Sequence, residues 1–524
     1  MSFLNGSPPE SHLVAFAYEA WGHTRSVIVF CARAAKTRPI LVTMFTPTSF
    51  YDRVTSELAR NFEAGEEAYL SRVRIVALES GDTITSPLLN TGFASSWRKM
   101  VDGEELVCAK TACRYPSVIP PRAAIIDCFA YESVRKIRDV SGDKAKIYGW
   151  IPSVLSAIFY YMFGPESVGG GVSMHAKAEA EAQRTGRTYE DVASELLMRG
   201  RGEVVRVPGL PPMYDYEYHP QHFPIFDGLN TSYLARTYDT MLLCDGAVVA
   251  TPESYEREAV AETRKLFNEI QKPVYVVGPL QASGAQAIEL EREQAPQAKE
   301  IEAFLDKTLK DFGDRTLLYI SFGSIFWPMK VPEQLWAFLD AVMGLGIPFL
   351  LSHASPFAAI PDPVREKVRE YGEGLMVPWV PQQQVLNHPV TGWFVTHGGH
   401  NSVLEALTAG VPQIFWPFEA DQPLNAVRLT EHFDAAYELL EVRTGLGLKP
   451  LYRTGKAPTG TLDAIKAEAR DVLKRAFGEE GAVKRARALK LREAVLAEWE
   501  EPAGENQGGA SRRDFEAFVD ALQE

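Results

Sequence analysis

A short segment in the second half of the chain combines residue types that bind an anion. Residues 392–396 (GWFVT) are an apolar run typical of a buried strand, and the glycine-containing turn 397–400 (HGGH) follows. Asn401 and Ser402 favour a helix N-cap, and the helical pattern ends at Gly410. The N–H groups and positive dipole of a helix start attract phosphate, and glycines let a ligand approach the backbone. The pattern therefore predicts an anion site.

Residues around this segment indicate which chemical groups are attached to the anion in the expected ligand. Glu405 follows Asn401 by four residues, so it shares that helix face and could accept hydrogen bonds from ribose hydroxyls. Trp379 offers a flat face for a base, and such stacking is worth about 1–3 kcal/mol in nucleic-acid-binding proteins. Asp421 and Gln422 follow a predicted strand, where parallel sheets bind ligands, and could hold sugar hydroxyls.

The segment from Trp379 to Gln422 resembles the donor-binding box of plant-type family-1 UDP-dependent glycosyltransferases. It spans 44 residues and keeps the family spacing at positions that include His397, Glu405 and Asp421. Residues 319–324 (YISFGS) resemble the strand-to-loop element that approaches the phosphates in this family. The resemblance implies the GT-B fold, with two Rossmann-like doubly wound α/β domains that face a central cleft.

The same resemblance assigns a part of a UDP-sugar to each matching residue. Uracil would stack on Trp379 with Gln382 beside it, and Glu405 would bind the ribose. Asp421 and Gln422 would bind the hexose, and Gln422 is typical of glucose users, so the expected donor is UDP-glucose. His400 stands where plant members usually have Trp, near the transferred sugar. The residues implied at the diphosphate are Ser324, His397, Gly399, Asn401 and Ser402.

The first half of the chain carries a candidate general base. His23 lies between a predicted strand at 12–17 and a helical pattern from Thr24, and a helix N-terminus keeps an imidazole uncharged. Taken alone, this residue is better explained as a structural loop histidine. The resemblance reverses that preference, because residues 12–23 resemble the family's first strand and its catalytic Gly-His pair. Asp127 matches the family's histidine-orienting aspartate, although a strand-end Asp could instead cap a helix.

The implied reaction is a single inverting displacement. An acceptor hydroxyl, hydrogen-bonded by His23 and oriented through Asp127, would attack the anomeric carbon opposite UDP. Neutral donors and the helix dipole would stabilise the departing diphosphate, so no metal and no cofactor beyond the co-substrate UDP-sugar is expected.

An aromatic run in the first half suggests an acceptor site. Phe159, Tyr160 and Phe163 precede the glycines at 169–171, which predicts a mobile apolar wall for a small hydroxylated acceptor such as a phenol. The alternative is a buried helix followed by a loop. Residues 213–218 (MYDYEY) would add further aromatic surface in the same domain.

Alternating strands and helices must position these residues. Many strands are apolar on both faces, which indicates parallel sheets in a doubly wound α/β architecture. We expect an N-terminal acceptor-binding domain (1–270) and a C-terminal UDP-sugar-binding domain (271–500), with a linker at 281–299. A last helix (501–524), capped by Ser511, is expected to cross back to the N-terminal domain. The predicted strands cover 12–17, 39–45, 73–78, 123–126, 247–250, 274–277, 317–322, 349–352, 375–377, 392–395 and 413–416.

Composition narrows the functional class. The 524 residues carry 54 Lys and Arg against 68 Asp and Glu, and this net charge of −14 disfavours nucleic acid and anionic membranes as partners. An odd number of cysteines, five, fits a reducing compartment, and no long apolar run is present, so we expect a cytoplasmic protein. The alternatives are a nucleotide-sugar epimerase on the same fold and a non-catalytic nucleotide-sugar binder.

Overall fold

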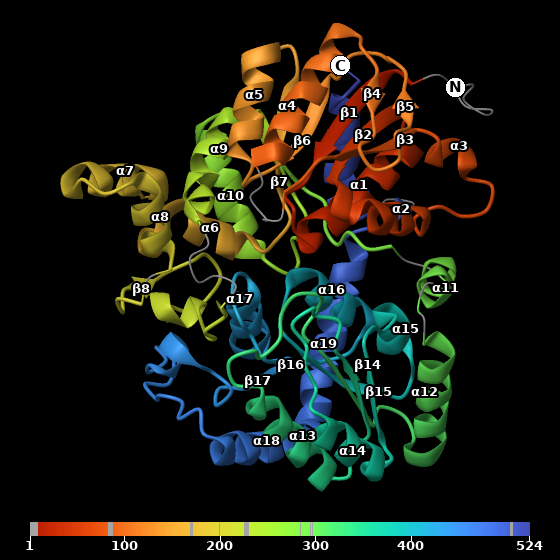
Figure 1. Ribbon diagram of the computed structural model, residues 1–524, viewed down its shortest axis with the longest axis vertical. Helices are drawn as coiled ribbons and strands as arrows, with labels where there is room; N and C mark the ends of the chain where they lie inside the picture. Colours follow the sequence, from red (N-terminus) through yellow and green to blue (C-terminus); the bar gives the residue numbers. More distant parts are fainter. Residues whose placement is uncertain are drawn as a thin grey trace. The chain divides into compact units, whose positions relative to one another are not determined.

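The computed structural model forms two units, each built around its own sheet (Figure 1). Unit 1 comprises Met1–Leu197, Asn230–Ala287 and Ala497–Glu524, and unit 2 comprises Met198–Leu229 and Ile288–Leu496. The structure describes residues 9–81, 87–167, 171–198, 200–224, 230–282, 285–293, 295, 297–503 and 507–523.

The sheet of unit 1 has seven parallel strands among the described residues. Their order is β11-β10-β7-β6-β1-β2-β3, so β1, which precedes the loop leading to the predicted base, and β6, which ends at its partner Asp127, are neighbours. The strands are β1 (Ser11–Phe16), β2 (Ile40–Pro47), β3 (Val73–Leu78), β6 (Ala123–Asp127), β7 (Lys146–Ile151), β10 (Gly246–Val249) and β11 (Val274–Val276).

Helices cover both faces of this sheet because its strands are apolar on both sides. On one face, α1 (Trp21–Thr37), α2 (Tyr51–Ala59) and α20 (Ala510–Ala521) share a core with alternate residues of β1 and β2. On the other face, α4 (Pro87–Asp102) and α5 (Tyr131–Ser141) cover the intervening residues. The loops at the carboxyl ends of the strands therefore emerge between two helical layers.

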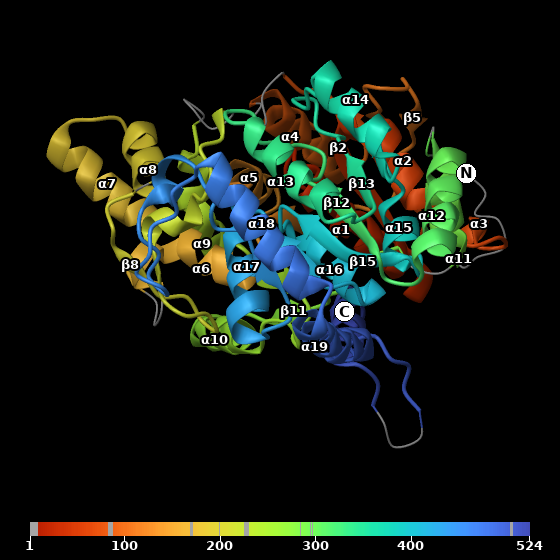
Figure 2. The ribbon, with the colours of Figure 1, turned by 90° about the horizontal axis from the view of Figure 1, so that it is seen from below.

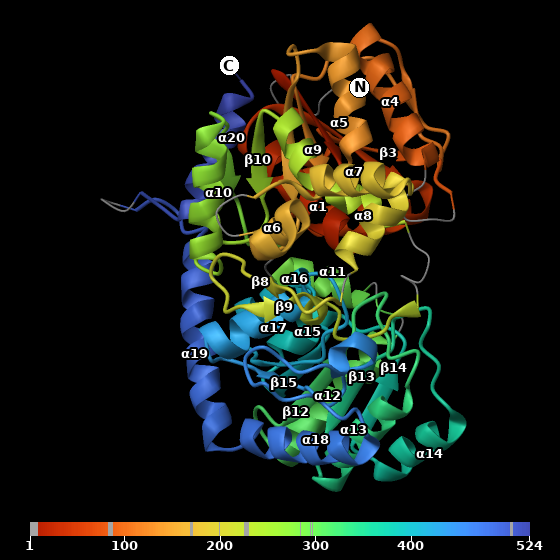
Figure 3. The ribbon, with the colours of Figure 1, turned by 90° about the vertical axis from the view of Figure 1, so that its left-hand side faces the viewer.

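The last helix packs on unit 1 (Figure 3). Phe515 and Phe518 contact the ring of Phe30 with centroids 5.2 and 5.3 Å apart. Asp514 accepts the backbone N–H of Val276 at 2.8 Å. The predicted cap is wrong, because the N-cap is Gly509 and Ser511 lies in the first turn, where its hydroxyl bonds a carboxylate.

The sheet of unit 2 has six parallel strands in the described part of the chain. Their order is β14-β13-β12-β15-β16-β17. One face is covered by α13 (Glu333–Gly344) and α18 (Leu462–Ala476), which lie side by side (Figure 2), and the other by α12 (Ala298–Phe312), α15 (Gln382–Asn387) and α16 (His400–Ala409). The strands are β12 (Leu317–Ser321), β13 (Phe349–Ser352), β14 (Gly374–Val377), β15 (Thr391–Thr396), β16 (Gln413–Phe415) and β17 (Tyr437–Glu438).

Residues 200–224, which we call the strap, belong to unit 2 although they precede its sheet in the sequence. The strap holds the short strands β8 (Val204–Val205) and β9 (Met213–Tyr214) and the turn η3 (Asp215–Tyr218). The prediction that 213–218 adds aromatic surface to the first domain is therefore wrong. The segment 281–299, predicted to be a surface linker, contains α11 (Ala285–Glu293) and the start of α12.

The remaining elements are short hairpin strands and connecting helices. Within the described ranges, no helix is both long enough and apolar enough to cross a bilayer. These elements are α3 (Glu67–Leu70), β4 (Leu106–Val107), β5 (Arg114–Tyr115), α6 (Leu155–Phe163), α7 (Met174–Thr185), α8 (Tyr189–Leu197), α9 (Thr237–Leu243), α10 (Arg257–Glu269), α14 (Asp362–Tyr371), α17 (Gln422–Val427) and α19 (Glu479–Ala497).

Candidate active site

His23 and Asp127 form a hydrogen-bonded pair in unit 1. His23 Nδ1 lies 2.7 Å from Asp127 Oδ2, and the Asp127 side chain is fully buried while that of His23 is 20% exposed. Helix α1 begins at Trp21, so His23 lies inside its first turn rather than before a helix starting at Thr24. The pairing leaves Nε2 as the ring nitrogen that can accept a proton.

Backbone groups hold the carboxylate of Asp127 in place. Its Oδ2 accepts the N–H of Tyr18 at 3.1 Å, and its Oδ1 accepts the N–H of Phe129 at 3.1 Å. Asp127 ends β6, beside β1, so the strand order itself brings it to the loop before His23. The carboxylate can therefore fix the orientation of the imidazole and stabilise its charged form.

Aromatic side chains surround His23. The centroid of its ring lies 5.4 Å from that of Phe129 and 6.3 Å from that of Tyr18. Tyr18 stacks on Tyr233 at 5.0 Å, and Phe129 meets Tyr161 edge-on at 5.7 Å. Burial raises the pKa of Tyr18, and it raises that of Tyr233 to about 12, so both phenols are neutral donors at neutral pH.

The predicted acceptor wall is part of the core instead. Phe159, Tyr160 and Phe163 lie on α6 with at most 3% of their surface exposed, so the buried-helix alternative is the correct one. Their neighbour Tyr161 is the residue of this helix that contacts Phe129 beside His23. Of the predicted glycine hinge, Gly169 and Gly170 lie outside the described residues.

In unit 2, the loops after β12 and β15 meet at the ring of His397. An ideal Cβ at Gly323 would lie 2.9 Å from Cε1 of this ring, and one at Gly399 would lie 2.6 Å from Nε2. Phe326 stacks on the ring at 5.6 Å. Glycine is required on both sides, because any side chain there would displace the imidazole.

The buried imidazole of His397 suits a neutral hydrogen-bonding role. Burial lowers its pKa to about 4, so it is uncharged at neutral pH. Its Nδ1 is buried and makes no hydrogen bond of good geometry among the described residues, and the backbone of Ser321 is the polar group that interacts with the ring. A buried polar atom without a partner is costly, and a bound ligand group would remove that cost.

Helix α16 starts directly after this turn. Its N-cap is Gly399, so Asn401 and Ser402 are first-turn residues rather than the predicted caps, and the helix ends at Gly410 as expected. The first intrahelical bond joins Val403 N–H to Gly399 C=O. Asn401 and Ser402 therefore lie in the first turn, at the positive end of the helix, beside the turn that contains His397.

Glu405 is buried one turn into α16 and is held by two amides. Gln382 Nε2 donates to Glu405 Oε2 at 2.6 Å, and Gln383 Nε2 donates to Oε1 at 3.3 Å. Gln382 also accepts a hydrogen bond from the hydroxyl of Tyr319 at 3.1 Å. Two predicted donor residues, Gln382 and Glu405, thus lie in one network, and Tyr319 and Gln383 are members that the sequence did not reveal.

The remaining predicted donor residues follow β14 and β16. Trp379, after β14, is partly exposed and leaves ring surface for stacking. Asp421 Oδ2 accepts the N–H of His400 at 3.3 Å, which ties the loop after β16 to the start of α16. Gln422 is buried, and its Oε1 accepts the N–H of Phe418 at 2.8 Å, so its amide nitrogen is the group left for a ligand.

His400, the departure from the plant pattern, is buried in unit 2. Its side chain is surrounded by protein, and burial together with the nearby charge of Arg428 lowers its pKa to about 3. A neutral imidazole therefore occupies this position.

Known proteins resemble the chain over its length. The family described as "UDP-glucoronosyl and UDP-glucosyl transferase" matches residues 284–444. The UDP-glycosyltransferase eriJ of Hericium erinaceus is 29% identical over 483 residues, which are 89% of this chain and 90% of the relative.

Solved structures share the fold. A transferase of Siraitia grosvenorii in complex with UDP superposes with a TM-score of 0.69 at 18% identity, covering 98% of this chain and 100% of the other. UGT2 of Phytolacca americana, complexed with UDP-2fluoro-glucose and pterostilbene, gives a TM-score of 0.65 at 20% identity, covering 98% and 100%. Two parallel α/β sheets of this kind are the GT-B fold, and residues 284–444 are similar in sequence to the UDP-dependent glycosyltransferases.

Proposed function

We propose that the chain transfers glucose from UDP-glucose to a hydroxyl of a small aromatic acceptor, with inversion. The observation that carries this proposal is the turn between β15 and α16 at the carboxyl edge of the unit 2 sheet. There, the buried Nδ1 of neutral His397 has no hydrogen bond of good geometry among the described residues and lies beside the N-terminus of α16.

In this proposal each part of the donor has its own residues. Uracil stacks on Trp379, and the network of Gln382 and Glu405 binds the nucleoside. Asp421 and the amide nitrogen of Gln422 bind the hexose. The diphosphate is held by the helix N-terminus and the turns beside it, which supply Ser324, His397, Gly399, Asn401 and Ser402.

His23 acts as general base. The acceptor O–H proton moves to Nε2 of His23 while the acceptor oxygen bonds to the anomeric carbon of glucose. The bond between that carbon and the β-phosphate oxygen breaks, and UDP leaves with the electron pair. Asp127 stabilises the imidazolium that results, and such proton transfer contributes about 10²–10⁴ in rate.

The acceptor is assigned to the aromatic surroundings of His23. Rings of Tyr18, Phe129, Tyr161 and Tyr233 provide apolar and edge-on contacts that suit a flat hydroxylated molecule. The Phytolacca structure, complexed with pterostilbene, supports a ligand of similar size for this chain. No metal is required in this account, because the charge on the leaving diphosphate is met by neutral donors and a helix dipole.

A panel of acceptors tests the proposal. Purified protein is incubated with UDP-glucose and phenols, flavonoids, terpenoid alcohols or oligosaccharides, with and without EDTA, and products are scored by mass. The expected result is hexosylated phenolic products whether or not EDTA is present. An epimer formed from UDP-glucose alone would instead indicate an epimerase, and binding without UDP release would indicate a non-catalytic binder.

A further inference from the structure

The strap is anchored to the second half of unit 2 along much of its length. Tyr216 donates its hydroxyl to the C=O of Pro450 at 2.5 Å, and Glu217 accepts the N–H of Tyr452 at 2.8 Å. Gln221 Nε2 donates to the C=O of Val442 at 2.7 Å. Each anchor joins residues more than 200 positions apart, so the strap is a fixed part of unit 2.

One strap residue contacts the loop that follows β16. His219 Nδ1 lies 2.8 Å from Oε2 and 3.0 Å from Oε1 of Glu419, a bidentate contact. The two side chains are only 10% and 9% exposed. A buried carboxylate needs such a partner, because removing the partner leaves a charge that water cannot reach.

Glu419 belongs to the loop that presents the proposed hexose ligands. Ala420 adopts a left-handed conformation with φ of 61°, which a residue with a side chain rarely takes without external support. Asp421 and Gln422 follow directly, and Gln422 Oε1 accepts the N–H of Glu419 at 3.2 Å. The position of Glu419 therefore determines where Asp421 and Gln422 lie.

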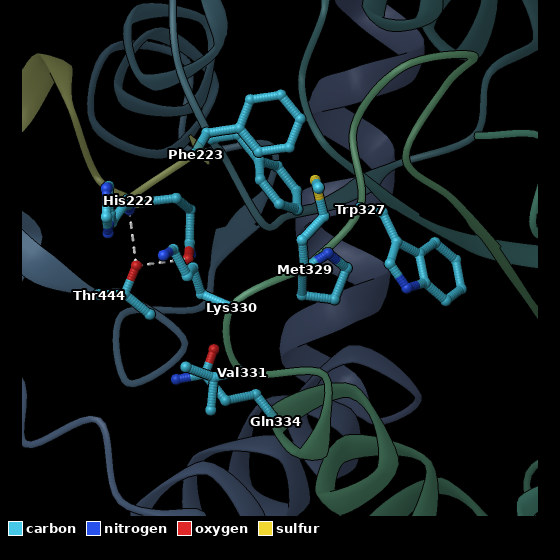
Figure 4. A pocket seen from close by; sticks show the side chains of 11 residues that line it. His222, Phe223, Trp327, Met329, Lys330, Val331, Gln334 and Thr444 are labelled. Carbon is cyan, nitrogen blue, oxygen red and sulfur yellow. Dashed lines mark hydrogen bonds between the residues drawn. The ribbon is translucent and has the colours of Figure 1, made fainter. Parts of the chain in front are cut away.

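Aromatic packing supports the same loop from its other side. Phe223 of the strap contacts Phe418 at 6.0 Å and Phe326 at 5.0 Å, and Phe326 in turn stacks on His397. Two of these rings, Phe223 and Phe418, line a pocket of about 210 Å³, open mouth included, together with Trp327. Figure 4 shows Phe223 and Trp327 in this pocket. The predicted donor residues do not line it, so we assign it no ligand.

We propose that His219 is a positioning residue for the donor hexose. By holding Glu419, it fixes the loop in which Asp421 and Gln422 meet the sugar hydroxyls. UDP has no hexose, and its uracil and diphosphate are assigned to other residues, so UDP binding should depend much less on His219 than UDP-glucose binding does. The inference rests on the proposed donor site and adds to it a residue from a segment that precedes the unit 2 sheet.

Calorimetric titration with UDP and with UDP-glucose tests the inference. His219→Ala is expected to lower the affinity for UDP-glucose about tenfold or more, while the affinity for UDP stays within about twofold of the wild-type value. The KM for UDP-glucose should rise by the same factor, with kcat at saturation nearly unchanged. His222→Ala is the matched control, since this strap histidine has an exposed side chain and should leave both affinities unchanged.

A second pair of variants separates positioning from general damage. Glu419→Gln keeps a hydrogen-bond acceptor for His219 and should reduce UDP-glucose affinity less than His219→Ala does, again without affecting UDP. The double variant His219→Ala/Glu419→Ala removes both partners, so no carboxylate is left buried alone. Its loss of UDP-glucose affinity should be smaller than the summed losses in His219→Ala and Glu419→Ala.

Equal weakening of UDP and UDP-glucose by His219→Ala, or no change in either, would overturn the inference. If His219→Ala does not fold, Glu419→Gln decides by the same comparison of the two ligands. Failure of the wild-type protein to bind either nucleotide would refute the proposed function instead.

Discussion

The imidazole of His23 is hydrogen-bonded to a carboxylate that is itself inaccessible to water, with 2.7 Å between His23 Nδ1 and Asp127 Oδ2. The two residues are separated by 104 positions in sequence, and the pairing of β1 with β6 brings them together. This geometry leaves one nitrogen of a partly exposed ring for proton transfer.

Removing the imidazole should therefore abolish turnover without abolishing donor binding. His23→Ala is expected to lower kcat by about 10²–10⁴, and Asp127→Asn by about tenfold or more, because the ring loses its oriented partner. Initial rates with a phenolic acceptor and UDP titrations check this. His175→Ala is a matched control, since His175 is also paired with a carboxylate, Glu179 at 3.4 Å. Near-normal turnover by His23→Ala would contradict the assignment.

The close contact between Gly399 and His397 predicts a steric effect on nucleotide binding. Gly399→Ala would place a methyl group 2.6 Å from Nε2 of His397, so the ring must shift away from the start of α16. UDP affinity should fall by about tenfold or more, measured by calorimetry. Gly344→Ala is the control, because a Cβ there meets nothing within 4 Å. Equal UDP affinities in the two variants would count against a phosphate site beside His397.

The proposed stacking of uracil on Trp379 is tested by substituting this residue. Trp379→Ala should cost about 1–3 kcal/mol of UDP binding, whereas Trp379→Phe should retain part of it because a flat face remains. Calorimetric dissociation constants give the comparison. If alanine and phenylalanine bind UDP as tightly as tryptophan does, the uracil lies elsewhere.

The burial of three histidines predicts that the folded protein becomes less stable in acid. Burial lowers the pKa of His12 to about 3, assisted by Arg74, that of His397 to about 4, and that of His400 to about 3, assisted by Arg428. The unfolded chain takes up these protons near pH 6.5 and the folded chain does not. Stability is therefore complete above pH 6.5 and decreases as the pH falls toward 4 and 3.

Urea unfolding at pH 7 and pH 5 measures this effect. Each of the three histidines should lower the free energy of unfolding by about 1.4 kcal/mol for every pH unit below 6.5. His12→Gln should reduce the difference between the two pH values, and His222→Gln, at an exposed position, should not. An unchanged difference in His12→Gln would show that other groups control the acid response.

Much of the fold was predictable because parallel strands buried on both faces are apolar throughout. The eleven predicted strands are confirmed, whereas β17, at the edge of the unit 2 sheet, and β7, in the middle of the unit 1 sheet, were missed. Strand β7 starts with a lysine and contains Gly149, where an ideal Cβ would lie 2.4 Å from Sδ of Met241. Glycine is present there for the close approach of a helix, which a strand pattern does not reveal.

The site was less predictable where its residues are aromatic, because aromatic residues also fill the core. Phe159 and Tyr160 are buried, yet the adjacent Tyr161 contacts the rings near His23, and only the placement of α6 separates these roles. The contact between His219 and Glu419 spans 200 residues, and no local spacing signals it. By contrast, the donor segment was predictable because a strand, a glycine turn and a helix start are consecutive in the sequence.

The central claim is that the carboxyl edge of the unit 2 sheet binds a UDP-sugar. Its most direct test is calorimetric titration of the wild-type protein with UDP-glucose and with UDP in the presence of EDTA, followed by addition of a phenolic acceptor. The account predicts that both nucleotides bind one site per chain, and that the acceptor converts bound UDP-glucose to UDP and a glucoside. No measurable affinity for either nucleotide, at protein concentrations where the fold is intact, would contradict it.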